Sequence, residues 1–271
     1  MFNPFTPALN SLLPEPQASL LNGILFGVKT TMPPYLYNAL ISTGTLHIIA
    51  LSGMNISILA NLTAQITLFL GRKASSIISI CLIVLFVLFV GPNPSVVRAA
   101  IMGCLSLSAV YFGRQDWGVL SLFLAAGIML LIDFSLIKNL SFQLSFLATL
   151  GIILANRKAE CQSASWRRNG LINQFKYWFK ENLKLTLSAQ LFTLPIILYN
   201  FHRLSLVAPI ANLAIEWVIQ PIMVLGFTVA IAGWLWQPLG LLLAWFVWVP
   251  LTYLITIVEW LAKVPLASIQ F

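Results

Sequence analysis

The stretch His47-Ile-Ile-Ala-Leu-Ser-Gly-Met-Asn55 places a histidine, a serine–glycine pair and an asparagine inside an otherwise apolar run. Gly91-Pro-Asn-Pro-Ser-Val-Val-Arg98 and Leu140-Ser-Phe-Gln-Leu-Ser-Phe146 bring polar residues into other apolar parts of the chain. Polar side chains at bilayer depth cost roughly 1 to 3 kcal/mol each, so they are retained there for helix packing or for transport. The three stretches therefore predict membrane helices with a few polar positions that serve one of these purposes.

The composition defines the class of protein. Hydrophobic residues make up 59% of the 271 residues, charged residues make up only 8%, and the mean hydropathy is +0.92. A water-soluble chain of this length needs far more polar surface, so a soluble globular domain is excluded. The sequence predicts an all-α protein, a polytopic bundle of transmembrane helices with broken helices and amphipathic interfacial helices.

The cysteines indicate neither a disulfide framework nor a metal site. Cys81 and Cys104 lie in apolar runs, and Cys161 lies far from both in the sequence. Zinc sites and disulfide-rich domains use closely and regularly spaced cysteines, which this chain lacks. We expect no metal and no cofactor.

Apolar runs of about 20 residues are long enough to cross a bilayer as a helix. About eight such segments are predicted, and the turns between them carry glycine, proline or charged residues. The predicted spans cover residues 44–70, 76–92, 95–112, 117–133, 139–155, 185–201, 205–232 and 238–262.

The net charge of +8 is concentrated in one polar segment, residues 156–184, which holds seven of the 15 lysines and arginines. Because basic loops are retained on the cytoplasmic side, we expect this segment to be a cytoplasmic loop. The protein would then lie in a bacterial plasma (inner) membrane with both termini outside. Basic segments at a membrane also attract anionic lipid or DNA, and the charge alone does not choose between these ligands.

The first 40 residues form a different kind of segment. Leu13-Pro-Glu-Pro16 is a good helix start, and the apolar stretch after it is too short to cross a bilayer. We expect residues 1–40 to form an interfacial segment and residues 41–271 to form the transmembrane domain. Residues 171–184 alternate apolar and basic positions at helical spacing, which is typical of an amphipathic helix on the inner leaflet.

Several motifs resemble, in order and approximate spacing, those of the competence DNA-uptake channels, the ComEC family. The resemblance covers about residues 12 to 225 and rests on Leu13-Pro-Glu-Pro16, Gly23 and Gly27, Thr43-Gly44, His47, Ser52-Gly53, Arg98-Ala99, Phe142-Gln-Leu-Ser-Phe146 and Asn212-Leu213. It implies an inner-membrane channel core that imports transforming single-stranded DNA during natural competence, and it implies no enzymatic activity.

Two departures from the family pattern limit that expectation. Many members have a second histidine where this chain has Asn55. A role as metal ligand or proton carrier for that histidine therefore does not apply to this chain. Full-length members also carry an oligonucleotide-binding-type domain and a metallo-beta-lactamase-like domain, and this sequence has no segment that could form either. With only His47 and His202 in the sequence, a lactamase-type metal centre is excluded. We therefore expect single-stranded DNA and the lipid bilayer as partners, together with a separate DNA receptor, nuclease and cytoplasmic motor.

A conduit for single-stranded DNA would present positive charge to phosphate without holding the strand tightly. Arg98, at the start of a span behind two prolines, is the first candidate for a phosphate contact, and Arg203 is the second. Either arginine can instead be a snorkelling residue at the membrane interface.

Other polar residues are candidates for lining the same path. Asn212, Glu216 and Gln220 recur every four residues and would form one stripe on a helix that Pro209 and Pro221 are able to break. The alternative for the polar positions inside spans is hydrogen bonding between helices. It applies to Gln143, Ser145, Gln190 and Asn212.

Two alternative functions belong to other classes. A proton-coupled transporter of small solutes would use Glu216 and His47. An intramembrane serine protease would pair Ser52 with His202, although His202 lies at the end of a predicted span.

Overall fold

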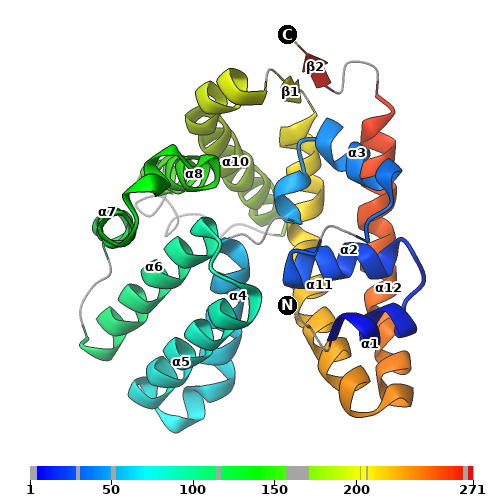
Figure 1. The fold of residues 1–271 in the computed structure, drawn as a ribbon, viewed down its shortest axis with the longest axis horizontal. Helices are drawn as coiled ribbons and strands as arrows, with labels where there is room; N and C mark the ends of the chain where they lie inside the picture. The colour runs from blue at the N-terminus through cyan, green and yellow to red at the C-terminus, as the bar shows by residue number, and fades with distance from the viewer. Residues whose placement is uncertain are drawn as a thin grey trace. The chain divides into compact units, whose positions relative to one another are not determined.

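The computed structural model describes residues 5–28, 31–49, 53–113, 117–156, 171–201, 203–205, 207–264 and 268–270, with the backbone alone described for 156, 171–179, 201, 203–204 and 268–270. The described residues form 11 α-helices, three short 3₁₀ helices and one sheet of two short strands (Figure 1). The predicted all-α membrane bundle is confirmed. The small sheet was not predicted.

The chain forms two compact units that are not consecutive in sequence. One unit combines residues 1–51 with residues 202–271, and the other comprises residues 52–201. We call them the terminal unit and the central unit. The predicted interfacial segment, residues 1–40, falls inside the terminal unit.

The central unit contains eight helical elements. They are α4 (Gly53–Thr67), the 3₁₀ helix η2 (Leu68–Leu70), α5 (Arg72–Val90), α6 (Pro94–Tyr111), α7 (Gly118–Ile132), η3 (Phe134–Lys138), α8 (Leu140–Asn156) and α10 (Leu171–Phe201). Helices α4, α5 and α6 pack against one another, α6 also contacts α7 and α8, and α8 packs along α10 (Figure 1). Helix α6 is therefore in contact with four other helices of the unit.

The turn between α5 and α6 follows from its sequence. Gly91 ends α5 with φ 104°, a conformation that side chains with a Cβ disfavour. Pro94 begins α6 at a position where its missing N–H costs nothing. At the other end of this helix pair, the Lys73 ammonium lies 5.7 Å from the centre of the Tyr111 ring.

Helices α8 and α10 approach closely at Gly151. A Cβ at this position would lie 2.8 Å from the main-chain oxygen of Ser188 and 3.0 Å from the ring of Phe192. Only glycine allows this contact without a shift of one helix.

The terminal unit is built around two long antiparallel helices. Its elements are α1 (Phe5–Leu12), α2 (Gln17–Phe26), α3 (Pro34–Ser42), η1 (Leu46–Ile48), β1 (Arg203–Ser205), α11 (Ala208–Leu235), α12 (Gln237–Ala262) and β2 (Ser268–Gln270). Helices α1 and α2 pack against α11 and α12, and α3 packs against α12 (Figure 1). Strand β1 pairs antiparallel with β2, with Arg203 opposite Gln270.

Glycines set the closest approach of α11 and α12. A Cβ on Gly240 would lie 2.6 Å from the Cα of Gly233, and a Cβ on Gly233 would lie 2.4 Å from Leu12 of α1. Helices α1, α11 and α12 therefore come into close contact at a point where α11 and α12 each have a glycine.

Helix α2 is buried along its whole length, polar residues included. The Gln17 amide donates to the Thr252 hydroxyl on α12 at 3.2 Å, and the Asn22 amide donates to Asn10 on α1 at 2.8 Å. These hydrogen bonds satisfy the buried amide nitrogens, whereas Gln17 Oε1 and Asn22 Oδ1 have no partner among the described residues. The interfacial position of residues 1–40 stays a prediction.

Each of the eight predicted spans coincides with an α-helix over most of its length. Among the described residues, five helices are long and apolar enough to cross a membrane: α5, α6, α11, α12, and α4 extended by η2 to Leu70. The apolar helices α7 and α8 are shorter, at 15 and 17 residues. The number of crossings therefore stays a prediction.

The structure corrects three details of the predicted spans. The first helix begins at Gly53 and not at residue 44, because residues 46–48 form the separate turn η1. The predicted interfacial helix, residues 171–184, and the span after it form one continuous 31-residue helix, α10. Helix α11 continues through Pro221 without the expected break, which membrane helices tolerate when neighbouring groups compensate the lost hydrogen bond.

Candidate functional site

The side chain of Arg98 connects α6 to α8 inside the central unit. Arg98 lies in the second turn of α6, after Pro94 has fixed the start of the helix. Its Nη1 donates to the main-chain oxygen of Ser145 and to the Thr149 hydroxyl on α8. The Thr149 hydroxyl in turn donates to the Ser145 oxygen at 2.9 Å. One turn of α8 therefore supplies both acceptors for the guanidinium.

Gly53 provides the space beside the same guanidinium. A Cβ at Gly53, the first residue of α4, would lie 3.2 Å from Arg98 Nη2 and 3.1 Å from the Cβ of Ala99. A larger side chain would push α4 away from α6 or displace the guanidinium. Gly53, Ala99 and Ser145, one residue from each of three stretches singled out in the sequence, thus lie around one side chain. We call this group the Arg98 cluster: Gly53, Arg98, Ala99, Ser145 and Thr149.

The Arg98 cluster holds a buried cation. The Arg98 side chain is 5% exposed, and its Nε has no hydrogen-bond partner among the described residues. Among the described residues, Lys184 and Glu181 on α10 form an ion pair, with 3.8 Å between Nζ and Oε1. None of the described carboxylates forms an ion pair with Arg98. A guanidinium has five N–H donors and stays protonated. The cluster is therefore a positive site whose Nε–H has no acceptor among the described residues, and the snorkelling alternative for Arg98 stays a prediction.

Three further predicted residues belong to the central unit. Asn55 is buried in the first turn of α4. Gln143 lies at the start of α8, where its amide nitrogen donates to the main-chain oxygen of Ile137 at 2.6 Å. Gln190 is half-buried on α10, and its main-chain oxygen accepts a hydrogen bond from the Thr193 hydroxyl at 3.2 Å.

The predicted residues of the terminal unit that the structure describes lie on three elements, η1, β1 and α11. His47 is exposed in η1, with Nδ1 3.1 Å from the main-chain oxygen of Gly44. Asn212 is half-buried on α11 and its Oδ1 has no partner among the described residues, whereas Glu216 and Gln220 are exposed on the same helix. Arg203 belongs to β1 by its backbone. Its side chain, like Ser52 and His202, lies outside the described residues.

The described residues contain no group of three histidine, cysteine, aspartate or glutamate side chains that could hold a metal ion.

Comparison with known proteins places this arrangement in a family. The family model described as competence protein matches residues 24–271. The chain belongs to the competence protein family. The match takes in Gly53, Arg98 and Ser145, so the Arg98 cluster lies within the family's own region.

Two curated relatives of this competence protein are much longer. ComE operon protein 3 of Bacillus subtilis is 27% identical over 206 residues, which are 75% of this chain and 25% of that protein. The uncharacterized protein YcaI of Escherichia coli is 28% identical over 242 residues, 82% of this chain and 30% of that protein. The chain thus spans about a quarter to a third of the relatives' length. No solved structure gives a significant match.

Thr149 is the member of the cluster that the sequence did not single out. It is four residues after Ser145 and therefore on the same face of α8, which is the signal that could have identified it. Ser145 accepts the hydrogen bond from Arg98 through its main-chain oxygen. This bond therefore depends on the position of α8 and not on the side chain at residue 145.

Proposed function

We propose that this competence protein forms the inner-membrane channel core through which transforming single-stranded DNA enters the cell. The observation that carries the proposal is the buried cation of Arg98, which has no carboxylate partner among the described residues and lies on α6, a helix long and apolar enough to cross a membrane. A positive charge surrounded by apolar protein exerts a stronger field than one in water, and it attracts polyanions.

The cluster acts on the strand mainly through its field. Arg98 is enclosed by α4, α6 and α8, so phosphates pass near it and do not remain bound to it. A weak, long-range attraction suits a conduit, because a strand that binds tightly at each charge does not leave. In this proposal Gly53 and Thr149 position the Arg98 guanidinium. The surface that faces the lipid is the apolar exterior of helices such as α5, where Leu85 and Leu88 are exposed.

The remaining parts of the uptake system are supplied by other chains in this proposal. A DNA receptor, a nuclease that degrades one strand and a cytoplasmic motor act with the channel core in the plasma membrane. The basic segment, residues 156–184, faces the cytoplasm, and the chain carries no enzymatic activity of its own.

A proton-coupled transporter is the second candidate. It is favoured by Glu216, an exposed carboxylate on α11, a helix long and apolar enough to cross a membrane. Titratable groups in such helices often carry protons. The predicted proton carriers Glu216 and His47 are both exposed, and they lie on different elements of the terminal unit. Among the described residues, no hydrogen bond joins them, since His47 bonds to Gly44. This arrangement favours the channel over the transporter.

Deletion of the gene in a naturally competent host tests the proposal. Labelled duplex DNA is added, and surface-bound DNA is distinguished from internalised DNA by treatment with DNase and by transformation frequency. We expect surface binding to persist and internalisation to be lost, with recovery when the wild-type gene is restored. Normal internalisation in the deletion strain would refute the channel function.

A further inference from the structure

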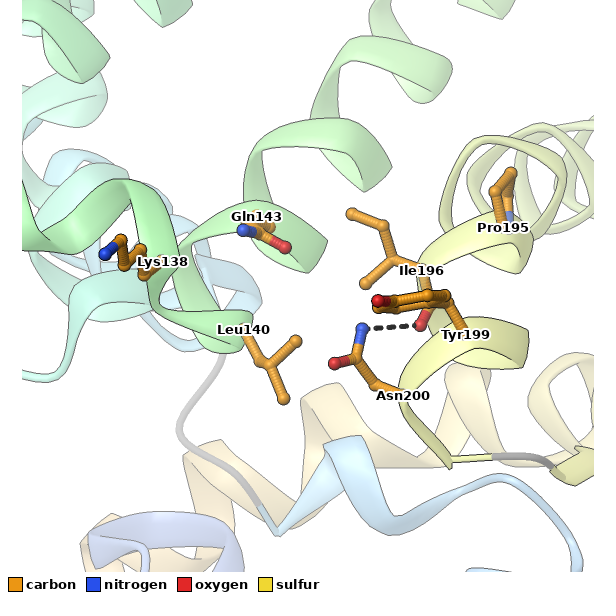
Figure 2. A pocket seen from close by; sticks show the side chains of 7 residues that line it. All are labelled: Lys138, Leu140, Gln143, Pro195, Ile196, Tyr199 and Asn200. Carbon is orange, nitrogen blue, oxygen red and sulfur yellow. Dashed lines mark hydrogen bonds between the residues drawn. The ribbon is translucent and has the colours of Figure 1, made fainter.

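An open cavity of about 640 Å³ lies in the central unit, between the start of α8 and the end of α10 (Figure 2). This volume is in the range of pockets that hold small organic ligands. Gln143 of the Phe-Gln-Leu-Ser-Phe stretch lines it, although the Arg98 cluster does not use this side chain.

One wall of the cavity is an aromatic and aliphatic surface. Tyr199 on α10 is 81% exposed, so its ring is largely free of packing within the protein. Ile196 and Leu140 line the cavity beside it (Figure 2). An accessible tyrosine ring with aliphatic neighbours is a stacking surface for a flat, apolar-faced ligand such as a nucleobase.

Two amide side chains present their oxygens to the same space. The Gln143 nitrogen donates to the Ile137 main-chain oxygen at 2.6 Å, and the Asn200 nitrogen donates to the Ile196 main-chain oxygen at 2.9 Å. These bonds orient the amides so that their carbonyl oxygens point into the cavity (Figure 2). Each oxygen can accept a hydrogen bond from an amino or imino N–H, which every nucleobase carries.

The charge at the edge of the cavity is positive. Lys138, the last residue of η3, lines the cavity with its stem, and its ammonium is turned away from Tyr199 (Figure 2). None of the seven lining residues is acidic. An anionic group would therefore bind at the rim, with an apolar and hydrogen-bonding part of the same ligand inside.

We propose that this cavity binds one nucleotide of single-stranded DNA, with the base against Tyr199, its N–H groups on the Gln143 and Asn200 oxygens, and a phosphate at Lys138. The proposal rests on the proposed function and names the site where the strand makes contact. Because the ring offers a stacking face to any base and each amide can accept or donate a hydrogen bond, binding tolerates all four bases, as a conduit requires.

A second cavity provides a matched control. It lies in the terminal unit, has a volume of about 410 Å³ and is also lined by a tyrosine and a lysine, Tyr35 and Lys263. It differs in carrying Glu259, whose carboxylate repels phosphate. Variants of Tyr35 and Lys263 therefore change the same residue types at a site where no DNA contact is proposed.

Equilibrium binding measures the contact directly. The purified chain, in nanodiscs of phosphatidylcholine, is titrated against a fluorescein-labelled 12-nucleotide single strand of mixed sequence, and anisotropy is recorded at several salt concentrations. We expect Tyr199→Ala to weaken binding about 5- to 150-fold, the cost of one lost base stack, and Tyr199→Trp to retain it. Lys138→Ala should weaken binding and reduce the salt slope by about 1.

The controls separate the possible results. Tyr35→Ala and Lys263→Ala should bind as the wild type does, and circular dichroism should show that every variant is folded. Equal affinities for wild type, Tyr199→Ala and Lys138→Ala would overturn the proposal. So would displacement of the oligonucleotide by soluble short-chain phosphatidylglycerol but not by mononucleotides, because that result would assign the cavity to a lipid headgroup.

Failure of this inference differs from failure of the channel function. If DNA import requires the chain but Tyr199→Ala imports and binds normally, the nucleotide site is refuted and the channel stands. If the deletion strain imports DNA normally, the channel function is refuted whatever the binding data show.

Discussion

The guanidinium of Arg98 on α6 donates to the main-chain oxygen of Ser145 on α8, two residues that are 47 positions apart in the sequence. The acceptor is backbone, so it persists whatever side chain stands at 145. A substitution can remove the second hydrogen bond, because Thr149 accepts it through its side-chain hydroxyl. This difference between neighbouring residues of one helix gives the first prediction.

Thr149→Val should destabilise the central unit, whereas Ser145→Ala should have little effect. Valine keeps the shape of threonine but removes the hydroxyl, and hydrogen bonds between membrane helices contribute about 0.6 to 2 kcal/mol each. Thermal unfolding in detergent measures the change. Equal loss in both variants would show that the Ser145 hydroxyl, and not its carbonyl, holds Arg98.

Arg98→Gln and Arg98→Lys separate the charge of Arg98 from its hydrogen bonds. Glutamine retains an N–H donor without charge, and lysine retains the charge as a compact point. If the field of the cation serves passing phosphates, Arg98→Lys should import DNA at a reduced level and Arg98→Gln should import none, with both proteins expressed and folded. Equal import by the two variants would reduce Arg98 to a structural connection.

Gly53→Leu should block DNA import, whereas Gly127→Leu should not. A side chain at Gly53 meets Ala99 and the Arg98 guanidinium within about 3.2 Å, whereas a Cβ at Gly127 on α7 meets nothing within 4 Å. Both substitutions replace a glycine of an α-helix by leucine, Gly53 as the first residue of α4 and Gly127 inside α7. Uptake of labelled DNA by cells with equal protein levels is the readout. Import at wild-type level by Gly53→Leu would contradict the close packing of α4 on α6.

Glu216→Gln should leave DNA import unchanged in a channel. The amide keeps the shape of the side chain and removes its titration, so a proton-coupled transporter would lose activity. Uptake assays at two external pH values measure this. Loss confined to Glu216→Gln, with Arg98 variants active, would favour the transporter.

Cysteine labelling tests the predicted orientation. In a chain whose native Cys81, Cys104 and Cys161 are replaced, a cysteine at Arg167 should react with a membrane-impermeant thiol reagent only from the cytoplasmic side, and a cysteine at Lys138 only from outside. Labelling of both from one side would change the number of crossings between them.

The sequence predicted most helices because their signals are local. Helix α5 is a long apolar run between two glycines, and α6 starts after a proline, so both could be located without tertiary information. The turn η1 was missed because residues 46–48 are as apolar as the helix that follows. The strands β1 and β2 have three residues each, too few for an alternating pattern to be recognised.

The candidate sites depended on contacts between distant residues, which one sequence does not reveal. Gly53, Arg98 and Ser145 were each identified by their residue type in an apolar run, but their meeting around one guanidinium depends on the packing of three helices. The cavity residues Tyr199 and Asn200 carried no local signal, because a tyrosine near the end of a span is usual at a membrane interface.

The burial of α2 has a consequence for biosynthesis. This helix leaves the ribosome early, yet the surfaces that cover it, on α11 and α12, are encoded after residues 52–201. At typical rates of translation, the intervening stretch takes roughly 8 to 30 s to make. During that time the apolar faces of α2 must be shielded from water by lipid or by an insertion factor. A messenger RNA truncated before codon 208 yields a chain that lacks α11 and α12, the helices against which α2 packs.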